Sequence, residues 1–188
     1  MHKLWIAAGL AVALAGVAPA DARAQAFITP YGGVVFGGDT PSSTLTTGIS
    51  LTFMGDVAGF ELDLGYTPDF FNEESAVALI ADSNVTTFMG SLLVGIGEGP
   101  VRPYVQAGTG LVRSRTDLGD LFDAVSVNEW GVTIGGGVTG LLSDHVGLRG
   151  DIRYIRSLED PEPDDDRDVV LGKFDFWRAT VGVVFKFP

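Results

Sequence analysis

The sequence predicts an all-β fold, an eight-stranded antiparallel up-and-down transmembrane β-barrel. Apolar and polar residues alternate with a period of two in eight segments, most of them near the roughly 9–11 residues that a tilted membrane strand needs. Short and longer connections alternate between these segments, which is typical of a membrane barrel. Aromatic residues gather at both strand ends, as expected for belts at two membrane interfaces.

The first 24 residues predict an export signal. Lys3 gives a positive start, residues 4–18 form an apolar stretch too short to span a bilayer as a helix, and Ala22-Arg23-Ala24 has the small-x-small pattern of a signal-peptidase site. We expect Sec-type export and cleavage between Ala24 and Gln25. This leaves residues 25–188 as the barrel domain.

Composition excludes several functions. The chain has 24 acidic and 12 basic residues and a net charge of −12, which argues against nucleic acid as a partner because phosphate binding needs a basic surface. It contains no cysteine, so disulfides, thiolate metal sites and a cysteine nucleophile are excluded. At 46% hydrophobic residues it is too apolar to be disordered.

The first four segments lie at about 27–36, 45–53, 58–66 and 86–96. The apolar face of the first cannot be assigned from its sequence. In the second, apolar residues and Thr47 alternate with threonine, glycine and serine, and in the third the intervening residues are Gly, Glu, Asp and Gly. The fourth alternates less cleanly. Each pattern still favours a half-apolar strand.

The last four segments lie at about 101–111, 130–140, 146–154 and 177–187. The first two of these alternate weakly. In 146–154 the polar face carries two arginines and an aspartate, and 177–187 is the clearest strand, with six apolar residues on one face. Short turns follow the second, fourth and sixth strands. An even strand count then places both ends of the exported chain on the short-turn side, which we expect to be periplasmic.

The polar face distinguishes a membrane barrel from a soluble one. It consists mostly of glycine, threonine and serine, which would make a poor surface in water. The same small residues suit the interior of an eight-stranded barrel, which is only wide enough for side chains. We therefore expect the apolar face to meet lipid, and a soluble periplasmic binding protein is the outside alternative.

Eight charged residues are predicted to face the lumen. A buried charge without a partner is costly, so we expect a satisfied interior network, with a gate or narrow pore as the alternative interpretation. The network residues are Glu61, Asp63, Glu129 and Asp151 against Arg149, Arg153, Arg178 and Lys186.

The last long connection is strongly acidic. Asp164, Asp165, Asp166 and Asp168 lie within five residues of one another, and carboxylates are the ligands that Ca²⁺ and Mg²⁺ prefer. The spacing does not match an EF-hand. We expect at most weak divalent-cation binding here, and no other cofactor.

Four segments carry a resemblance to a known family: YGGVVFGG, RPYVQAGTGL, GLRGDIRYIR and WRATVGVVFKF. In this order they resemble the small eight-stranded outer-membrane barrels of the OmpA and OmpX type, the outer-membrane protein β-barrel domain family. The resemblance implies a monomer in the outer membrane of a Gram-negative bacterium, surrounded by lipid and lipopolysaccharide. It also implies insertion by the barrel-assembly machinery, which reads a C-terminal aromatic residue; here Phe187 is followed by Pro188.

The predicted function is structural or surface-interacting, with long acidic loops facing outward and no enzymatic activity. A narrow, porin-like channel for ions or small solutes is the first alternative. The second is a lipid-modifying enzyme, which the sequence disfavours. Its only histidine after the export signal, His145, stands beside Ser143 and Asp144 in one short turn, whereas a catalytic triad converges from different elements.

Overall fold

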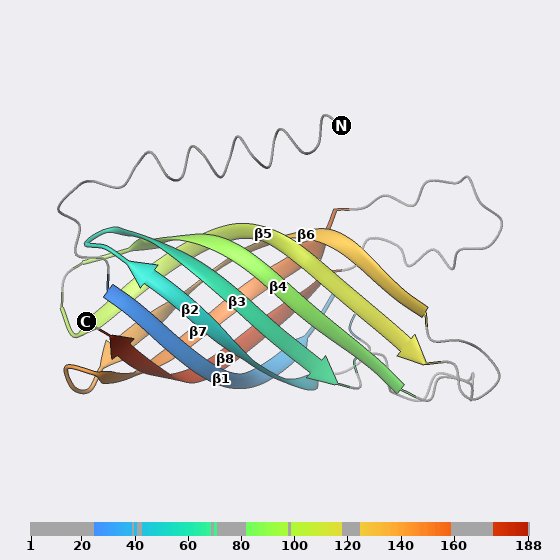
Figure 1. Cartoon of the computed structure of the whole chain (residues 1–188), viewed down its shortest axis with the longest axis horizontal. Helices are drawn as coiled ribbons and strands as arrows, with labels where there is room; N and C mark the ends of the chain where they lie inside the picture. The colour runs from blue at the N-terminus through green and yellow to red at the C-terminus, as the bar shows by residue number, and fades with distance from the viewer. Residues whose placement is uncertain are drawn as a thin grey trace.

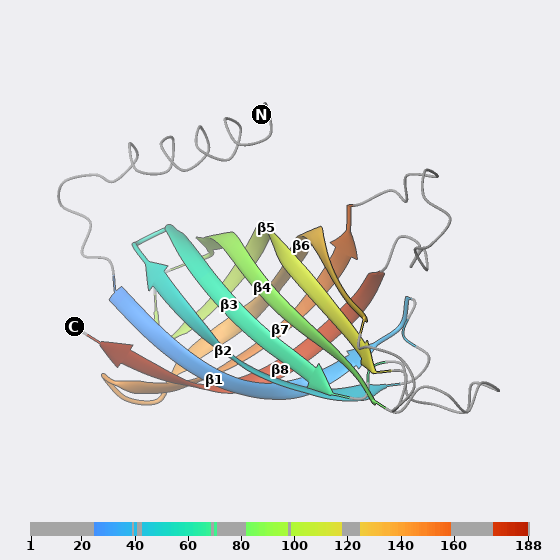
Figure 2. The same ribbon diagram turned by 45° about the vertical axis from the view of Figure 1, so that its right-hand side comes forward.

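A computed structural model describes residues 25–38, 40, 43–68, 70, 82–97, 99–117, 125–158 and 175–187. Eight antiparallel strands form one closed barrel in chain order (Figures 1 and 2), which confirms the predicted fold class. The strands are β1 (Gln25–Phe36), β2 (Thr44–Met54), β3 (Ala58–Pro68), β4 (Asp82–Gly95), β5 (Val101–Asp117), β6 (Val125–Leu141), β7 (Val146–Ser157) and β8 (Asp175–Phe187).

Closure comes from pairing between the first and last strands. The β1–β8 register begins at Ala26 opposite Phe187 and ends at Phe36 opposite Trp177. Every strand therefore has two hydrogen-bonded neighbours, which removes the free edge that an open sheet would expose. No described segment is a helix of the length and apolarity needed to cross a membrane.

The two ends of the barrel differ. The start of β1 and the end of β8 lie together (Figure 1), at the end that also carries the short turns after β2, β4 and β6. We call this the turn end and the opposite one the loop end. The strand faces follow the predicted alternation: Val181 is 67% exposed on the outside, whereas its neighbour Thr180 is buried.

β5 and β6 are longer than the sequence predicted, at 17 residues each. Their ladder continues to Thr116 opposite Val125, whereas the β6–β7 ladder ends at Gly131 opposite Ser157. Polar residues interrupt the apolar alternation in these extensions, so the alternation did not predict that the strands continue. Backbone pairing needs no apolar face, and the hairpin therefore extends past its neighbour β7.

The structure also assigns the faces of β1. Thr29, Tyr31 and Val35 point inward and are buried. Phe27 shares their face and lines the interior, so it does not belong to the turn-end aromatic belt. Outward aromatic side chains mark both ends of the barrel: Tyr66, Phe88, Trp130 and Trp177 at the loop end, and Phe53, Phe185 and Phe187 at the turn end.

Candidate functional site: the barrel interior

Three arginines and three carboxylates fill the middle of the lumen. They come from one strand on one side of the barrel and two strands on the other. All six are at most 9% exposed. The six residues are Glu61 and Asp63 on β3, Arg149, Asp151 and Arg153 on β7, and Arg178 on β8.

Arg153 is the centre of this network. Its Nη2 lies 2.8 Å from Glu61 Oε1 and 2.8 Å from Asp151 Oδ2, and its Nε donates to Asp151 Oδ1 at 3.0 Å. Its Nη1 lies 3.6 Å from Asp63 Oδ2. One guanidinium thus contacts all three carboxylates, and it links β7 to β3 across the lumen.

The other two arginines are each covered by a tyrosine. Arg149 forms an ion pair with Glu61 and lies 4.6 Å from the ring centroid of Tyr104, to whose hydroxyl its Nε donates at 2.6 Å. Arg178 Nη2 lies 2.5 Å from Asp63 Oδ1, and its guanidinium lies 5.2 Å from the ring centroid of Tyr31. The aromatic faces supply cation–π contacts in a site from which water is largely excluded.

Neutral hydroxyls donate further hydrogen bonds to two of the carboxylates, Glu61 and Asp151. Thr52 donates to Glu61 Oε2 at 2.7 Å, Thr180 donates to Asp151 Oδ1 at 3.1 Å, and Tyr104 donates to Asp151 Oδ2 at 3.0 Å. The charges of the six ionised residues sum to zero. Such pairing is what buried charges require if the structure is to be stable.

Inward-facing glycines provide the room for these large side chains. A Cβ on Gly137 would lie 2.6 Å from the Tyr104 hydroxyl, and one on Gly65 would lie 2.4 Å from Arg178 Nη1. Both distances are shorter than any ordinary carbon contact. The glycine on one strand and the tyrosine or arginine opposite it are therefore complementary parts of one packed interior.

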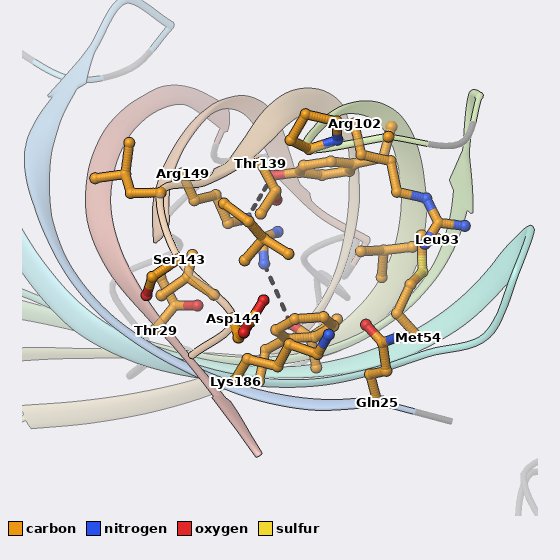
Figure 3. A pocket seen from close by; sticks show the side chains of 18 of the residues that line it. Gln25, Thr29, Met54, Leu93, Arg102, Thr139, Ser143, Asp144, Arg149 and Lys186 are labelled. Atoms are coloured by element: carbon orange, nitrogen blue, oxygen red, sulfur yellow. Dashed lines mark hydrogen bonds between the residues drawn. The ribbon is translucent and has the colours of Figure 1, made fainter. Parts of the chain in front are cut away.

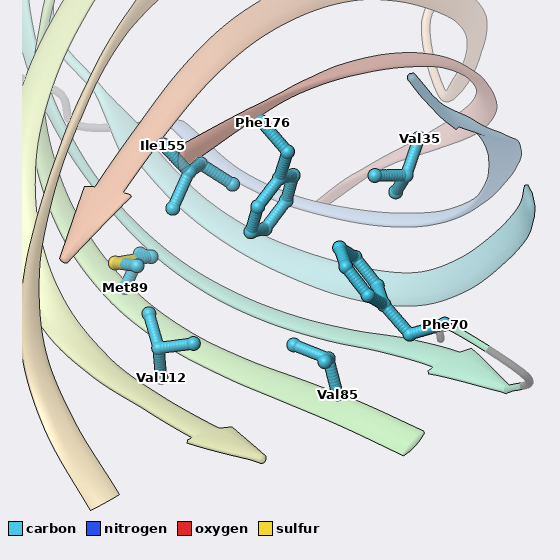
Figure 4. Packing of buried hydrophobic residues seen from close by; sticks show 7 residues of the cluster. All are labelled: Val35, Phe70, Val85, Met89, Val112, Ile155 and Phe176. Atoms are coloured by element: carbon cyan, nitrogen blue, oxygen red, sulfur yellow. The ribbon is translucent and has the colours of Figure 1, made fainter. Parts of the chain in front are cut away.

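An apolar cluster lies in the lumen between the network and the loop end. Its side chains converge from five strands and from Phe70, two residues beyond the end of β3 (Figure 4). The rings of Phe70 and Phe176 meet edge to face, with centroids 5.4 Å apart. The cluster consists of Val35, Phe70, Val85, Met89, Val112, Ile155 and Phe176, each at most 1% exposed.

A cavity of about 510 Å³ occupies the turn end (Figure 3). Met54, Leu93 and Phe27 supply apolar wall, and Arg102 and Lys186 bring positive charge to it. Its lining also includes Arg149, Tyr104 and Thr52, so the cavity reaches the network. Along the barrel axis, from the turn end to the loop end, the interior thus contains a cavity, then a neutral charge network and then an apolar cluster.

The structure separates two of the eight predicted lumen charges from the other six. Lys186 lines the turn-end cavity. Glu129 is half-buried near the loop end, opposite Val112 of the apolar cluster. The alternation pattern did not identify Tyr31 or Tyr104 as interior residues. Tyr104 shares a strand face with the polar residues Arg102 and Gln106, and this could have marked it as inward-facing.

Other sequence expectations fall outside the described residues. These are the export signal up to Ala24 and the acidic segment that contains Asp164, Asp165, Asp166 and Asp168; Gln25 is the first residue of β1. In the described part of the chain, no group of three or more acidic or histidine residues could hold a metal ion. The Ser143 hydroxyl accepts from the backbone N–H of His145 at 3.4 Å and of Val146 at 3.1 Å, which is how serine stabilises a tight turn.

Solved structures show the same architecture at low sequence identity. Neisserial surface protein A has 18% identity and a TM-score of 0.63, covering 87% of this chain and 97% of that chain. The N-terminal β-barrel domain of Pseudomonas aeruginosa OprF has 20% identity and a TM-score of 0.57, with 87% and 97% covered. Ail, the attachment invasion locus protein of Yersinia pestis, has 14% identity and a TM-score of 0.51, with 87% and 98% covered.

No curated protein matches the chain. The family described as "Outer membrane protein beta-barrel domain" matches residues 7–187, nearly the whole length. The match agrees with the resemblance that the strand motifs carry and with the closed barrel. The chain belongs to the outer membrane protein beta-barrel domain family, whose place is the cell outer membrane.

Proposed function

We propose that this protein is a non-conducting outer-membrane barrel that presents its loop end at the cell surface, in a structural or surface-interacting role. The observation that carries the proposal is the filled interior. A neutral network of buried ion pairs and an apolar cluster follow one another along the barrel axis. A barrel that served mainly as a pore would need a continuous polar path instead.

Two barriers oppose the passage of an ion. At the network, an ion would have to replace contacts such as Arg153 to Glu61 at 2.8 Å, and removing one partner from a buried pair costs several kcal/mol, on the order of 3–5. At the apolar cluster it would have to lose its hydration beside Phe70 and Phe176. These barriers act in series, so opening one alone leaves the lumen closed.

A narrow channel is the second candidate function. The turn-end cavity favours it, because about 510 Å³ of open space already leads to Arg149. Conduction would then require the network and the apolar cluster to rearrange together. Ion flow through the refolded protein would favour this candidate over the first.

Two serines provide a matched test of orientation. Ser43 precedes β2 at the loop end and Ser143 lies in the turn after β6, and both are exposed. The chain contains no cysteine, so Ser43→Cys and Ser143→Cys each introduce a single thiol. In intact cells a membrane-impermeant maleimide should label Ser43→Cys, whereas Ser143→Cys should react only after the outer membrane is permeabilised. The reverse order would overturn the proposed display of the loop end.

The same proposal includes Sec-type export, periplasmic termini and folding by the barrel-assembly machinery as a monomer. Phe187 supports the assembly step, since it is an exposed aromatic residue at the end of β8. Weak Ca²⁺ or Mg²⁺ binding by the acidic segment around Asp164 remains part of the proposal. A lipid-modifying activity is not included, because Ser143 is engaged in its own turn.

A further inference from the structure

Two cations line the turn-end cavity without a carboxylate partner. Arg102 of β5 is half-buried; its Nη2 donates to the Gly55 carbonyl oxygen at 3.1 Å, and its Nε is buried without a hydrogen-bond partner. Lys186 of β8 is also half-buried. Among the described residues, no ion pair engages either side chain. This distinguishes both of them from the three arginines of the network, each of which contacts a carboxylate.

An apolar wall lies between these two cations. Lys186 pairs with Phe27 where β8 meets β1. Met54 and Leu93 are buried in one cluster, against which Phe27 packs. From β8 through β1, β2 and β4 to β5, the residues that line the cavity therefore include, in order, Lys186, Phe27, Met54, Leu93 and Arg102 (Figure 3). The wall presents an apolar surface with a positive charge at either end.

Gly95 leaves the space in which Arg102 lies against that wall. A Cβ on Gly95 would lie 2.7 Å from Arg102 Nε and 2.7 Å from Met54 Cε. The guanidinium and the thioether methyl group therefore both lie over the glycine, and positive charge adjoins apolar surface. A charge that has lost part of its hydration is costly without a partner. A ligand with one anionic group for Arg102 and an apolar body for Met54 would complement both.

The surroundings of the cavity limit the charge and the size of such a ligand. Asp56 and Asp144 line it from exposed turns, and they oppose a ligand with several negative charges. Arg149 also lines the cavity, but its charge is already balanced by Glu61 and Asp151. The volume of about 510 Å³ lies within the range of small-molecule sites. These features favour a small molecule with a single negative charge.

We propose that the turn-end cavity binds a small carboxylic acid with an apolar body, with its carboxylate on Arg102 and its body against Met54 and Leu93. A guanidinium binds a carboxylate through paired, charge-assisted hydrogen bonds. Lys186, a more strongly hydrated cation at the other end of the wall, adds to the attraction of the anion into the cavity. The site goes beyond the proposed function, because binding here requires neither conduction nor a particular orientation of the barrel.

Two methionine methyl groups make a specific test possible. Met54 in the cavity wall and Met89 in the apolar cluster are the only methionines of the barrel domain. Labelling of methionine with ¹³C-methyl groups therefore reports on both parts of the lumen in one NMR spectrum. The protein, refolded into lipid nanodiscs, is titrated with hexanoate at neutral pH and constant ionic strength. The Met54 resonance should shift saturably, whereas the Met89 resonance should not move.

Two variants of β5 separate the proposed contact from a general effect of charge. Arg102→Gln should bind hexanoate at least about ten-fold more weakly than the unmodified protein. Arg113→Gln is the matched control, because Arg113 lies on the same strand but is exposed near the loop end; the affinity of this variant should change less than about two-fold. A difference in gel migration between unboiled and boiled samples verifies that each variant is folded.

Three further probes test the chemistry of the ligand. Hexanamide has the apolar body without the charge, acetate has the carboxylate without the body, and hexyl phosphate carries a larger negative charge on the same body. Each should bind more weakly than hexanoate. Equal affinity for any of the three, an unchanged affinity of Arg102→Gln, an equal loss in Arg113→Gln, or equal shifts of the Met54 and Met89 resonances would overturn the proposed site. The absence of a saturable Met54 shift would overturn it as well.

Discussion

Arg153 on β7 and Glu61 on β3 meet across the full width of the barrel. Their strands are four apart in a ring of eight, and yet Nη2 of the arginine lies 2.8 Å from Oε1 of the glutamate, 92 residues away in the chain. Since the two strands share no backbone hydrogen bonds, this contact forms only after the sheet has curled. The central ion pairs therefore connect opposite walls in a way that the strand ladders cannot.

Replacing Arg153 with methionine should strongly destabilise the barrel. The substitution leaves Glu61, Asp63 and Asp151 facing only two arginines, and an uncompensated buried charge costs about 3–5 kcal/mol. The measurement is urea unfolding of the protein in lipid vesicles. Unfolding is monitored on a denaturing gel as the loss of the difference in migration between unboiled and boiled samples. The double variant Arg153→Met/Glu61→Gln removes one charge of each sign and should lose less than the single variant; an additive loss would show that the two residues are not coupled.

Gly137→Ala should destabilise the interior by about 1–3 kcal/mol, because the added methyl group overpacks the lumen. Its Cβ would lie 2.6 Å from the Tyr104 hydroxyl and 2.3 Å from the Gly150 carbonyl oxygen. Gly140→Ala is the control on the same strand, since nothing lies within 4 Å of a Cβ there. Urea midpoints should differ between the two variants. Equal midpoints would mean that space around Tyr104 is not limiting.

Val181→Arg should impair folding into lipid vesicles, because the side chain meets lipid near the middle of the bilayer. An arginine at that depth costs about 2–4 kcal/mol. Thr139→Arg places the same charge in the turn-end cavity, where water can reach it. We expect a clearly lower folded yield for the first variant than for the second. The opposite ranking would mean that the apolar face does not meet lipid.

Calcium titration tests the acidic segment, for which the sequence remains the only guide. We expect weak binding, on the order of 10⁻⁴–10⁻³ M, which is typical of extracellular calcium modules. Changing Asp164, Asp165, Asp166 and Asp168 to asparagine should abolish the calorimetric response. An identical response in both proteins would assign the binding to other residues.

The sequence was sufficient to predict the architecture because period-two alternation is a local property. The inward parity of Glu61 and Arg153 follows from their neighbours along each strand, and the lumen side predicted for both is the one the structure gives. The weak alternation at 27–36 left the face of β1 open, and only the structure shows that Phe27 points inward. The extensions of β5 and β6 were not predicted because their residues are largely polar and do not alternate.

The composition of the network was only partly predictable, because it depends on height within a tilted barrel. Lys186 and Glu129 share the inward parity of the other charges, but they lie toward opposite ends of the lumen. Strand register and tilt decide such positions, and neither can be read from one strand alone. Parity along β5 could mark Tyr104 as inward, but its contact with Arg149 could not be predicted, because that contact depends on the space that Gly137 leaves opposite the tyrosine.

Electrical recording of the refolded protein in a planar bilayer tests the central claim most directly. With the network and the apolar cluster both in place, the account predicts no sustained single-channel conductance in the unmodified protein. The Arg153→Met/Glu61→Gln variant should also stay closed, because it leaves the cluster around Phe70 and Phe176 intact. Regular, long-lived conductance steps from the unmodified protein would contradict the account and establish a channel.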